Sequence, residues 1–496
     1  SYWKLLSDFN FNFLPSNISF SSNINRQLNR QNYRLVDVEG IGLETLYQRN
    51  YLFNYQYGFN YNLTKSLKLN FNATSSNIVR NYIDENNVPD NSYTLWSDFW
   101  NPGIPNTHNQ QVTVNYELPL SKIPFLAFIK PTYTYNGTFS WQRSSVALSS
   151  YFDATTNTTY NLGNTIQNSG NHKLNTQFNM ETFYKYIGLT KTKKNTKITQ
   201  TGPPKPGQKV TNTAVTPASE RSAFVEGLIS LATCIKNIQI NYSENQATAL
   251  PGYTPGLGFF GSSKPSLGFV FGVQDDVRFE AAKRGWLTDY PNFNQSYTEV
   301  LNRTLDFTAN IDLFPDFKID LSGNRTYATN FSEQYDVSGG NYNSRSPYST
   351  GNFAISTNMI ATSFKTSDEF GSAAFNQFRE NRLVIAHRLA QSYYPGGTYA
   401  LDAEGYPVGF GKNSQDVLLP AFIAAYSGKD ANKVSTGIFR TIPIPGWNVK
   451  YNGLMRYTFF KERFKRFSIQ HNYKASYTIN SFRSNIDFQA DVINPA

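Results

Sequence analysis

Hydrophobic and polar residues alternate strictly over several segments of this chain. From 53 to 63, mostly aromatic residues at odd positions alternate with Asn, Gln and Gly, and after a turn at 64–66 the alternation resumes over 67–74. Successive side chains of a β-strand point to opposite faces, so each segment predicts a strand with one apolar and one polar face. Similar alternation predicts hairpins over 112–141, 305–321 and 447–479. Each strand is about ten residues long, which is the length a tilted strand needs to cross a bilayer.

The two faces of the first hairpin supply the candidate functional residues. The side chains expected to face lipid are Phe53, Tyr55, Tyr57, Phe59, Tyr61, Leu69 and Phe71. The side chains expected to line a lumen are Asn54, Gln56, Asn60, Asn62, Asn70 and Asn72. A lining of neutral amides would let large cargo pass without adhering, whereas ion-selective pores concentrate rings of charge. The alternative is that these amides only satisfy hydrogen bonds between neighbouring strands.

Composition favours membrane strands over an ordinary soluble domain. Aromatic residues make up 16% of the chain and charged residues also 16%, where soluble domains average about 25% charged. Mean hydropathy is −0.47, and the chain has no run of about 18 apolar residues that would predict a membrane-spanning helix. In membrane strands the apolar residues of one face and the polar residues of the other offset each other in the mean hydropathy. Tight turns that alternate with long loops, expected at 79–110, 142–172 and 322–350, are also typical of outer-membrane barrels. The sequence therefore predicts an all-β fold, part of a very large transmembrane antiparallel β-barrel.

Four segments depart from the strand pattern. The Lys-, Thr- and Pro-rich segment 190–217 is expected to be a flexible basic Pro/Gly loop. Helical spacing predicts helices over 219–235, 367–391 and 415–427, with Ser219 and Ser367 as candidate N-caps of the first two. Helices this short and polar do not span a bilayer, so we expect them in long loops or inside a wide lumen.

The residues that carry chemistry are sparse. The four His residues have no Cys or His partner at a metal-ligand spacing, and no nucleophile, phosphate-loop or dinucleotide motif is present. We therefore expect no enzyme activity, no metal and no cofactor. The net charge is +10, but the densest basic run lies in the 190–217 loop and not on a focused face, so we expect no nucleic-acid partner.

Six long, irregular stretches spread over nearly the whole chain resemble the SprA/Sov family. They are NFNFLPSNISFSSNINRQLNR (10–30), LNFNATSSNIVRNY (69–82), LWSDFWNPGIPNTHNQQ (95–111), PGYTPGLGFFG (251–261), GWLTDYPNFNQSYTEV (285–300) and DVLLPAFIAAYSGKD (416–430). Proteins of this family are outer-membrane translocons of the type 9 secretion system in Bacteroidota and are linked to gliding motility. The resemblance implies a protein-conducting channel in the cell outer membrane that exports folded proteins.

The resemblance also implies an architecture and a set of partners. The family forms a single-chain barrel of about 36 strands with a lateral opening. The expected partners are a PorV-type outer-membrane barrel, a periplasmic plug protein, secreted cargo with C-terminal signal domains, and outer-membrane lipid. The family is several times longer than this chain, so we interpret residues 1–496 as a portion of one barrel domain that is cut at both ends. The competing interpretations are a TonB-dependent or porin-type transport barrel and a soluble β-sandwich surface adhesin.

Overall fold

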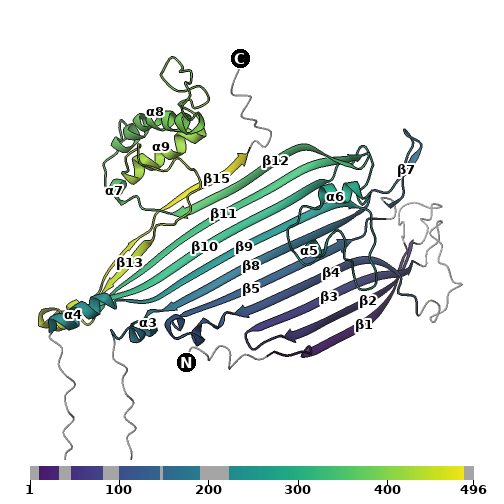
Figure 1. Ribbon diagram of the computed structural model, residues 1–496, viewed down its shortest axis with the longest axis horizontal. Coiled ribbons are helices and arrows are strands. Elements are labelled where there is room, and N and C mark those ends of the chain that lie inside the picture. The colour runs from purple at the N-terminus through teal and green to yellow at the C-terminus, as the bar shows by residue number, and fades with distance from the viewer. Residues whose placement is uncertain (1–10, 33–45, 82–99, 146–148, 190–222, 485–496) are drawn as a thin grey trace, which may run out of the picture.

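The described part of the chain forms one large antiparallel β-sheet. The computed structural model describes residues 11–32, 46–81, 100–145, 149–189 and 223–484. Along the main path of the sheet the strands follow sequence order (Figure 1). They are β1 (Asn17–Gln31), β2 (Leu46–Asn62), β3 (Leu67–Asn81), β4 (Ile104–Glu117), β5 (Ile129–Gln142), β8 (Asn164–Asn179), β9 (Ile235–Tyr253), β10 (Ser296–Phe314), β11 (Phe317–Ser338), β12 (Asn341–Ser356) and β15 (Ser476–Ser484). The prediction of an all-β fold is confirmed.

The two ends of the sheet differ in their connections. We call one the hairpin end, at the lower left of Figure 1, because it carries the tight turns 63–66 and 315–316. The same end holds short helices: η1 (Pro119–Lys122), η2 (Pro124–Leu126), α3 (Met180–Tyr186), α4 (Ala223–Ala232), η3 (Gly453–Arg456) and α10 (Thr458–Arg463). The opposite end, which we call the loop end, carries the long connection 254–295 with α5 (Leu267–Val270) and α6 (Arg278–Lys283), and the small hairpin of β6 (Tyr151–Asp153) and β7 (Thr158–Tyr160).

A helical insertion interrupts one position of the sheet. The upper part of β11 pairs with β12, while its lower part, from Phe317 to Ser322, pairs with β13 (Gly446–Tyr451). Strands β12 and β13 therefore occupy one strand position, separated by 89 residues (357–445) that contain α7 (Ile360–Ser363), α8 (Ala373–Tyr393) and α9 (Gln415–Ser427). The next position is shared in the same way by β14 (Ile469–Tyr473) and β15.

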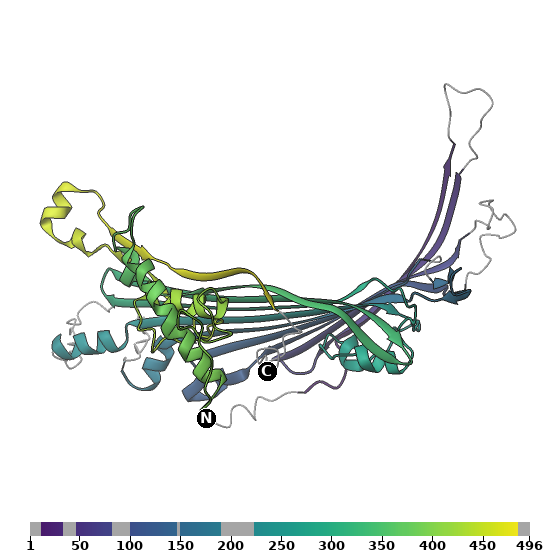
Figure 2. The same cartoon turned by 90° about the horizontal axis from the view of Figure 1, so that it is seen from above.

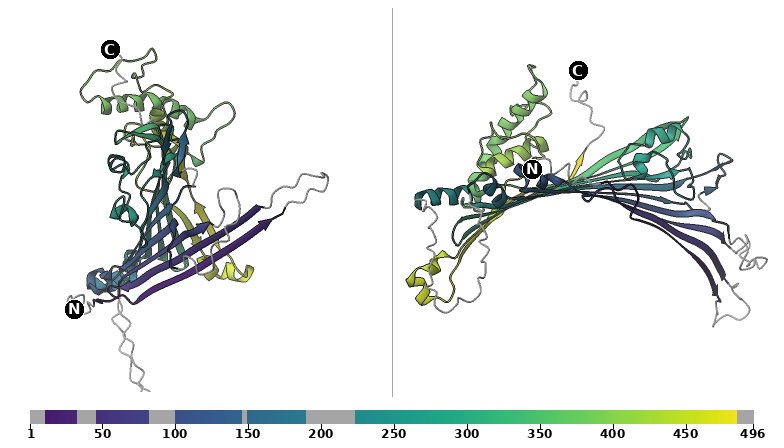
Figure 3. Two further views of the ribbon diagram at one scale, coloured as in Figure 1. Left: turned by 90° about the vertical axis from the view of Figure 1, so that its right-hand side faces the viewer. Right: turned by 60° about the horizontal axis from the view of Figure 1, so that its bottom comes forward.

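The helical insertion 357–445 and the long connection 254–295 lie on the same face of the sheet. Seen edge-on, α6 and the α8–α9 pair lie on one side of the strands (Figure 2), and a further view shows the same arrangement (Figure 3). Buried side chains gather in two clusters beneath them. One cluster lies between connection 254–295 and the loop end of β5 to β12, and the other lies between α8, α9 and strands β12 and β15.

Three expectations are wrong in detail. The long loop expected over 322–350 is instead strand, because β11 continues to Ser338 and turns at Gly339–Gly340, both at positive φ, into β12. Ser372, not Ser367, caps α8 by accepting a hydrogen bond from the Phe375 backbone N–H.

The third error concerns the first strand of the hairpin expected over 447–479, because that strand ends at Tyr451. Tyr451 pairs with Phe317, the first residue of β11, so the next residues have no strand partner on that side. They form η3 and α10, in which the backbone groups make local helical hydrogen bonds in place of bonds to a neighbouring strand.

The helices expected from sequence have partial counterparts. Helix α9 spans 415–427 as expected. Helix α8 spans 373–393, so it begins six residues later and ends two residues later than the helix expected over 367–391. Helix α4 falls within 219–235, whereas Ser219 and the 190–217 segment lie outside the described residues.

Candidate functional site

One face of the sheet is built from amide and hydroxyl side chains, and we call it the polar face. The register of β2 and β3 places Asn60 opposite Asn70, so the polar residues of the two strands share this face. All six residues expected to line a lumen lie on it, and all except the half-buried Asn54 are exposed. The other strands continue it with similar residues, among them Gln111, Asn136, Thr138, Gln177, Asn241 and Thr308. The described sheet therefore presents a wide, largely uncharged polar surface.

The amides of the polar face also bond to one another across strands. Gln111 Nε2 donates to Asn136 Oδ1 at 2.7 Å, and Thr113 Oγ1 donates to the same oxygen at 3.1 Å. On the next pair of positions, Thr134 Oγ1 donates to Asn115 Oδ1 at 3.1 Å. Hydrogen bonding between strands, the simpler explanation for the Asn content, thus occurs on this face. It coexists with exposure to solvent, because each amide has more donors and acceptors than these bonds use.

The opposite, apolar face carries all seven residues expected to face lipid. Phe59 lies opposite Phe71 and Tyr61 opposite Leu69 in the β2–β3 register. The Phe59 and Phe71 rings stack with centroids 5.5 Å apart. Cross-strand aromatic pairs of this kind stabilise a sheet by up to about 1 kcal/mol each.

Near the hairpin end the apolar face is uncovered. We call this region the apolar band; it consists of Leu69, Val114, Tyr133, Leu174, Ile238, Ile240, Tyr242, Phe307, Ala309, Ile311, Ile319, Leu321 and Val449. Each of these side chains is half-buried or exposed, and none is buried. The band crosses the sheet from β3 to β13. Contiguous apolar surfaces of this kind are rare on monomeric soluble proteins and mark sites of contact with a partner or a membrane.

Near the loop end the same face is covered by residues 254–295, which we call the covering connection. The Tyr55 ring stacks on Phe259 at a centroid distance of 4.4 Å, and its hydroxyl donates to the Phe259 carbonyl oxygen at 2.6 Å. The Tyr57 ring meets Phe260 edge to face at 5.4 Å. Tyr55 is only 4% exposed, so the expectation that it faces lipid needs correction: the covering connection leaves it no open surface. Tyr57 and Phe71 keep part of theirs.

Polar side chains on the covered half of the apolar face bind the backbone of the covering connection. Gln110 Nε2 donates to the Val270 carbonyl oxygen at 2.7 Å. Asn168 Nδ2 donates to the carbonyl oxygens of Phe269, at 3.1 Å, and Val273, at 2.8 Å. Because a buried carbonyl without a partner costs about 1–3 kcal/mol, these amides satisfy groups that would otherwise oppose docking.

Two glycines allow the covering connection to approach the strands closely. Gly137 of β5 lies opposite Gly170 of β8. A Cβ atom at Gly137 would lie 2.0 Å from the Phe271 carbonyl oxygen, and one at Gly170 would lie 2.4 Å from the Gly272 carbonyl oxygen. Any larger residue at either position would force the connection away from the sheet.

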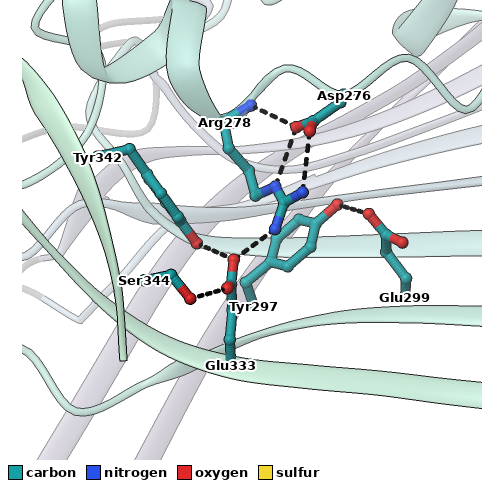
Figure 4. Close-up of polar contacts among 7 residues, drawn as sticks. All are labelled: Asp276, Arg278, Tyr297, Glu299, Glu333, Tyr342 and Ser344. Carbon is teal, nitrogen blue, oxygen red and sulfur yellow. Dashed lines mark hydrogen bonds and ion pairs between the residues drawn. The ribbon is translucent and has the colours of Figure 1, made fainter. Parts of the chain in front are cut away.

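An ionic network anchors the C-terminal half of the covering connection (Figure 4). Arg278 donates two hydrogen bonds to Asp276, Nε to Oδ1 at 2.9 Å and a terminal nitrogen to Oδ2 at 2.8 Å. Its other terminal nitrogen donates to Glu333 of β11, whose carboxylate also accepts from Tyr342 at 2.7 Å and from Ser344. The guanidinium lies over the Tyr297 ring, 4.5 Å from its centroid. One cation therefore joins the connection to strands β10, β11 and β12.

The charges of this network are buried to different degrees. The Glu333 side chain is 3% exposed and that of Arg278 is 15% exposed, while Asp276 is 43% exposed. Burial disfavours the charged form of Asp276, but the hydrogen bonds from Arg278 outweigh it and lower the pKa of that carboxyl. A buried ion pair of this kind adds little net stability as a pair, but removing one partner is costly.

The covering connection and the residues that bind it were not predicted from the sequence. The available signal is a break in the apolar register at one height of the sheet, where His108 and Gln110 of β4 and Asn168 of β8, on either side of β5, replace apolar residues. Polar residues close together on an apolar face indicate that other polar groups lie against that face. Here those groups are backbone carbonyl groups of the covering connection. His108 itself is buried and bonds to Ser75 Oγ through Nδ1 at 2.7 Å.

No helix in the described part of the chain is long and apolar enough to cross a membrane. Across the same residues, no three His, Cys, Asp or Glu side chains gather in a group suited to a metal ion. The candidate functional site consists of the polar face, the apolar band and the covering connection.

The chain matches no protein-family model and no curated protein.

Proposed function

We propose that this sheet is part of the wall of a very large outer-membrane β-barrel. In this arrangement the polar face lines the lumen and the apolar band meets lipid. The observation that carries the proposal is the separation of the two faces over the whole width of the sheet, with an uncovered apolar band on only one of them. In a soluble protein such a band would need a cover, and the described residues place no second sheet over it.

The lengths of the strands explain why the apolar face is covered at one end only. Strand β10 has 19 residues, which corresponds to about 63 Å at roughly 3.3 Å per residue. Tilted by about 45°, it rises some 45 Å, whereas the apolar zone of a membrane barrel is about 25 Å tall. The strands therefore extend past the bilayer, where their apolar face would meet water. The covering connection lies over this part of the face, whereas the α8–α9 insertion packs on β12 and β15 at the level of the middle of β10.

The edges of the sheet require further strands. Strand β1 pairs only with β2, and β15 pairs only with β12, within the part of the chain that the structure describes. Free backbone groups at a sheet edge cannot remain in lipid, because each one costs several kcal/mol there. The proposal therefore includes additional strands that pair with both edges and close the barrel.

Within this barrel we propose a protein-conducting function in type 9 secretion, linked to gliding motility. The resemblance to the SprA/Sov family supports this function, and its stretches coincide with insertions as well as strands: 251–261 and 285–300 include the two ends of the covering connection, and 416–430 contains all of α9 except its first residue. These irregular stretches are more specific than strand alternation, which any barrel shares. The proposed partners are a PorV-type barrel, a periplasmic plug, secreted cargo with C-terminal signal domains, and outer-membrane lipid.

The test uses two adjacent residues of β3 that point to opposite faces. Leu69→Cys places a thiol on the apolar band and Asn70→Cys places one on the polar face, each in a Cys234→Ser background in the protein in its own outer membrane. A maleimide that is soluble in water but not in lipid should label position 70 and leave position 69 unlabelled. After transfer to nanodiscs, a fluorophore at 69 should be quenched by nitroxide lipids and one at 70 should not.

Other results distinguish the alternatives. Equal labelling at 69 and 70, together with extraction of the protein without detergent, would identify a soluble adhesin. A membrane-embedded barrel whose loss leaves secretion of proteins with C-terminal signal domains intact would instead identify a different transport barrel, of the porin or TonB-dependent class.

A further inference from the structure

The connection between β13 and β14 is a basic, aromatic projection at the hairpin end. It spans residues 452–468 and contains η3 and α10. Its root is fixed to the β10–β11 turn, because the Asn452 N–H donates to the Asp316 carbonyl oxygen at 3.0 Å and Arg456 Nε pairs with Asp316 Oδ2 at 2.6 Å. Beyond that root the connection extends past the last paired residues of the sheet, Tyr451 and Ile469.

The aromatic side chains of this projection pack on one another and remain exposed. The Phe460 ring lies 5.0 Å from Phe467 and 6.1 Å from Phe464, centroid to centroid, and Phe464 lies 5.3 Å from Phe467. Phe459 is 57% exposed, Phe464 42% and Tyr457 62%. An aromatic cluster that forms locally but keeps this much open surface is suited to insertion into a boundary between water and an apolar phase.

Basic residues surround the cluster. Lys461, Arg463, Lys465 and Arg466 are all exposed, and Glu462 is the only acidic residue between 453 and 468. The Arg463 guanidinium lies over the Phe459 ring, 4.1 Å from its centroid, so that cation and ring form one surface. Exposed aromatic rings beside several Lys and Arg residues fit a membrane interface, where the rings enter the headgroup region and the cations meet phosphate.

The neighbouring connections at the hairpin end also carry exposed apolar side chains. The residues that are 46% exposed or more are Phe125 of η2, Ile187 after α3, Leu228 and Leu231 of α4, and Phe314. Phe314 also packs on Phe317 and Tyr451, at 4.6 Å and 6.0 Å, directly above the root of the projection. The apolar band therefore continues into a row of exposed apolar side chains at the level of the turns.

We propose that the 453–468 projection docks onto the phospholipid surface at the hairpin end of the barrel and binds anionic headgroups. This inference rests on the membrane placement proposed above. It assigns the projection to a lipid surface in preference to an acidic protein partner, because exposed aromatic rings lie directly beside exposed cations there, as in the contact of Arg463 with Phe459.

The test places a fluorophore at position 464 by Phe464→Cys, in a Cys234→Ser background of the whole protein in nanodiscs. Nanodiscs of phosphatidylcholine alone are compared with nanodiscs that also contain phosphatidylglycerol, both doped with headgroup-depth nitroxide lipid. We expect quenching that is strongest with phosphatidylglycerol and weakens at high salt. The variant Lys465→Gln/Arg466→Gln should lower the docking constant on anionic nanodiscs about 25-fold, roughly fivefold per charge. The matched control Lys429→Gln/Lys433→Gln, two exposed lysines of the helical insertion, should change it less than twofold.

A second fluorophore position separates failure of this inference from failure of the membrane placement. Quenching at Phe307→Cys on the apolar band without quenching at 464 would overturn docking while leaving the barrel proposal intact, and would point to a protein partner for the projection. Equal quenching at 464 with and without phosphatidylglycerol would overturn the headgroup preference. Absence of quenching at both positions would overturn both proposals.

Discussion

Replacing Arg278 with Met should release the C-terminal half of the covering connection while leaving the sheet folded. The substitution keeps much of the side-chain volume and removes the cation that bridges Asp276 and Glu333. Glu333 would then be a carboxylate with a 3% exposed side chain and only hydroxyl donors, from Tyr342 and Ser344. Breaking a buried pair by removing one partner costs about 3–5 kcal/mol. We expect the lower end, about 3 kcal/mol, because the two hydroxyls continue to solvate the carboxylate.

Hydrogen exchange measures this change locally. The Ala281 N–H bonds to the Val277 carbonyl oxygen inside α6 at 2.9 Å, so its exchange reports opening of the covering connection. A loss of about 3 kcal/mol should speed exchange roughly a hundredfold, while amides in the middle of β10 stay protected. Adding Glu333→Gln should restore much of the protection, because it removes the buried charge that Arg278→Met leaves behind.

A matched control lies six residues further along the same connection, at Arg284. Arg284 pairs with Glu280 in an ion pair whose side chains are 56% and 51% exposed. Exposed pairs contribute about 0–1 kcal/mol, so Arg284→Met should change the exchange of Ala281 less than about fivefold. Equal effects of Arg278→Met and Arg284→Met, or a loss of protection throughout β10, would show that the Arg278 bridge does not hold the covering connection on the sheet.

Three further predictions concern the covered face and the lumen. Gly137→Ala should destabilise the docked connection by about 1–3 kcal/mol, because its Cβ would lie 2.0 Å from the Phe271 carbonyl oxygen; hydrogen exchange of 267–273 measures this, and Gly371→Ala, where no atom lies within 4 Å of the new Cβ, should have no such effect. The lowered pKa of Asp276 means that its contribution to docking is complete above the ordinary Asp range and is lost as pH falls through the lowered value; Trp286 fluorescence during acid titration should show a transition that Asp276→Asn removes, and an unchanged transition would contradict the assignment. Conductance through the opened pore should discriminate weakly between cations and anions because the polar face is rich in neutral amides; reversal potentials in a salt gradient measure this, and strong charge selectivity would count against that lining.

The strands near the hairpin end were predictable because only their position in the sheet determines which residues are apolar and which are polar. Over β2–β3 and β10–β11 each apolar position faces the same side, so period-two alternation specifies both the strands and their faces. The predicted strands were too short, however. Toward the loop end, polar residues such as Glu244 and Arg303, which pair across strands at 3.0 Å, occupy the apolar register and conceal the continuation of the strand.

The covering connection was not predictable from local pattern because its contacts are distant in sequence. Tyr55 and Phe259 are 204 residues apart, and Gln110 and Val270 are 160 apart. The alternation around Tyr55 is the same as that around Phe59, yet one ring is buried and the other is 37% exposed. Only the fold-back of 254–295 distinguishes them. The end of β13 at Tyr451 has a similar cause, because it depends on where β11 begins and not on the residues that follow.

The most direct test of the proposed barrel wall is a scan of single fluorophores along β10, from Leu305 to Leu313, in nanodiscs that contain nitroxide lipids. We expect quenching with a period of two, strong at Leu305, Phe307, Ala309 and Ile311 and weak at Asp306, Thr308 and Asn310, with water-soluble quenchers giving the opposite pattern. Uniform protection from lipid along the strand, or the same response on both faces, would contradict a wall that has lipid on one side and water on the other.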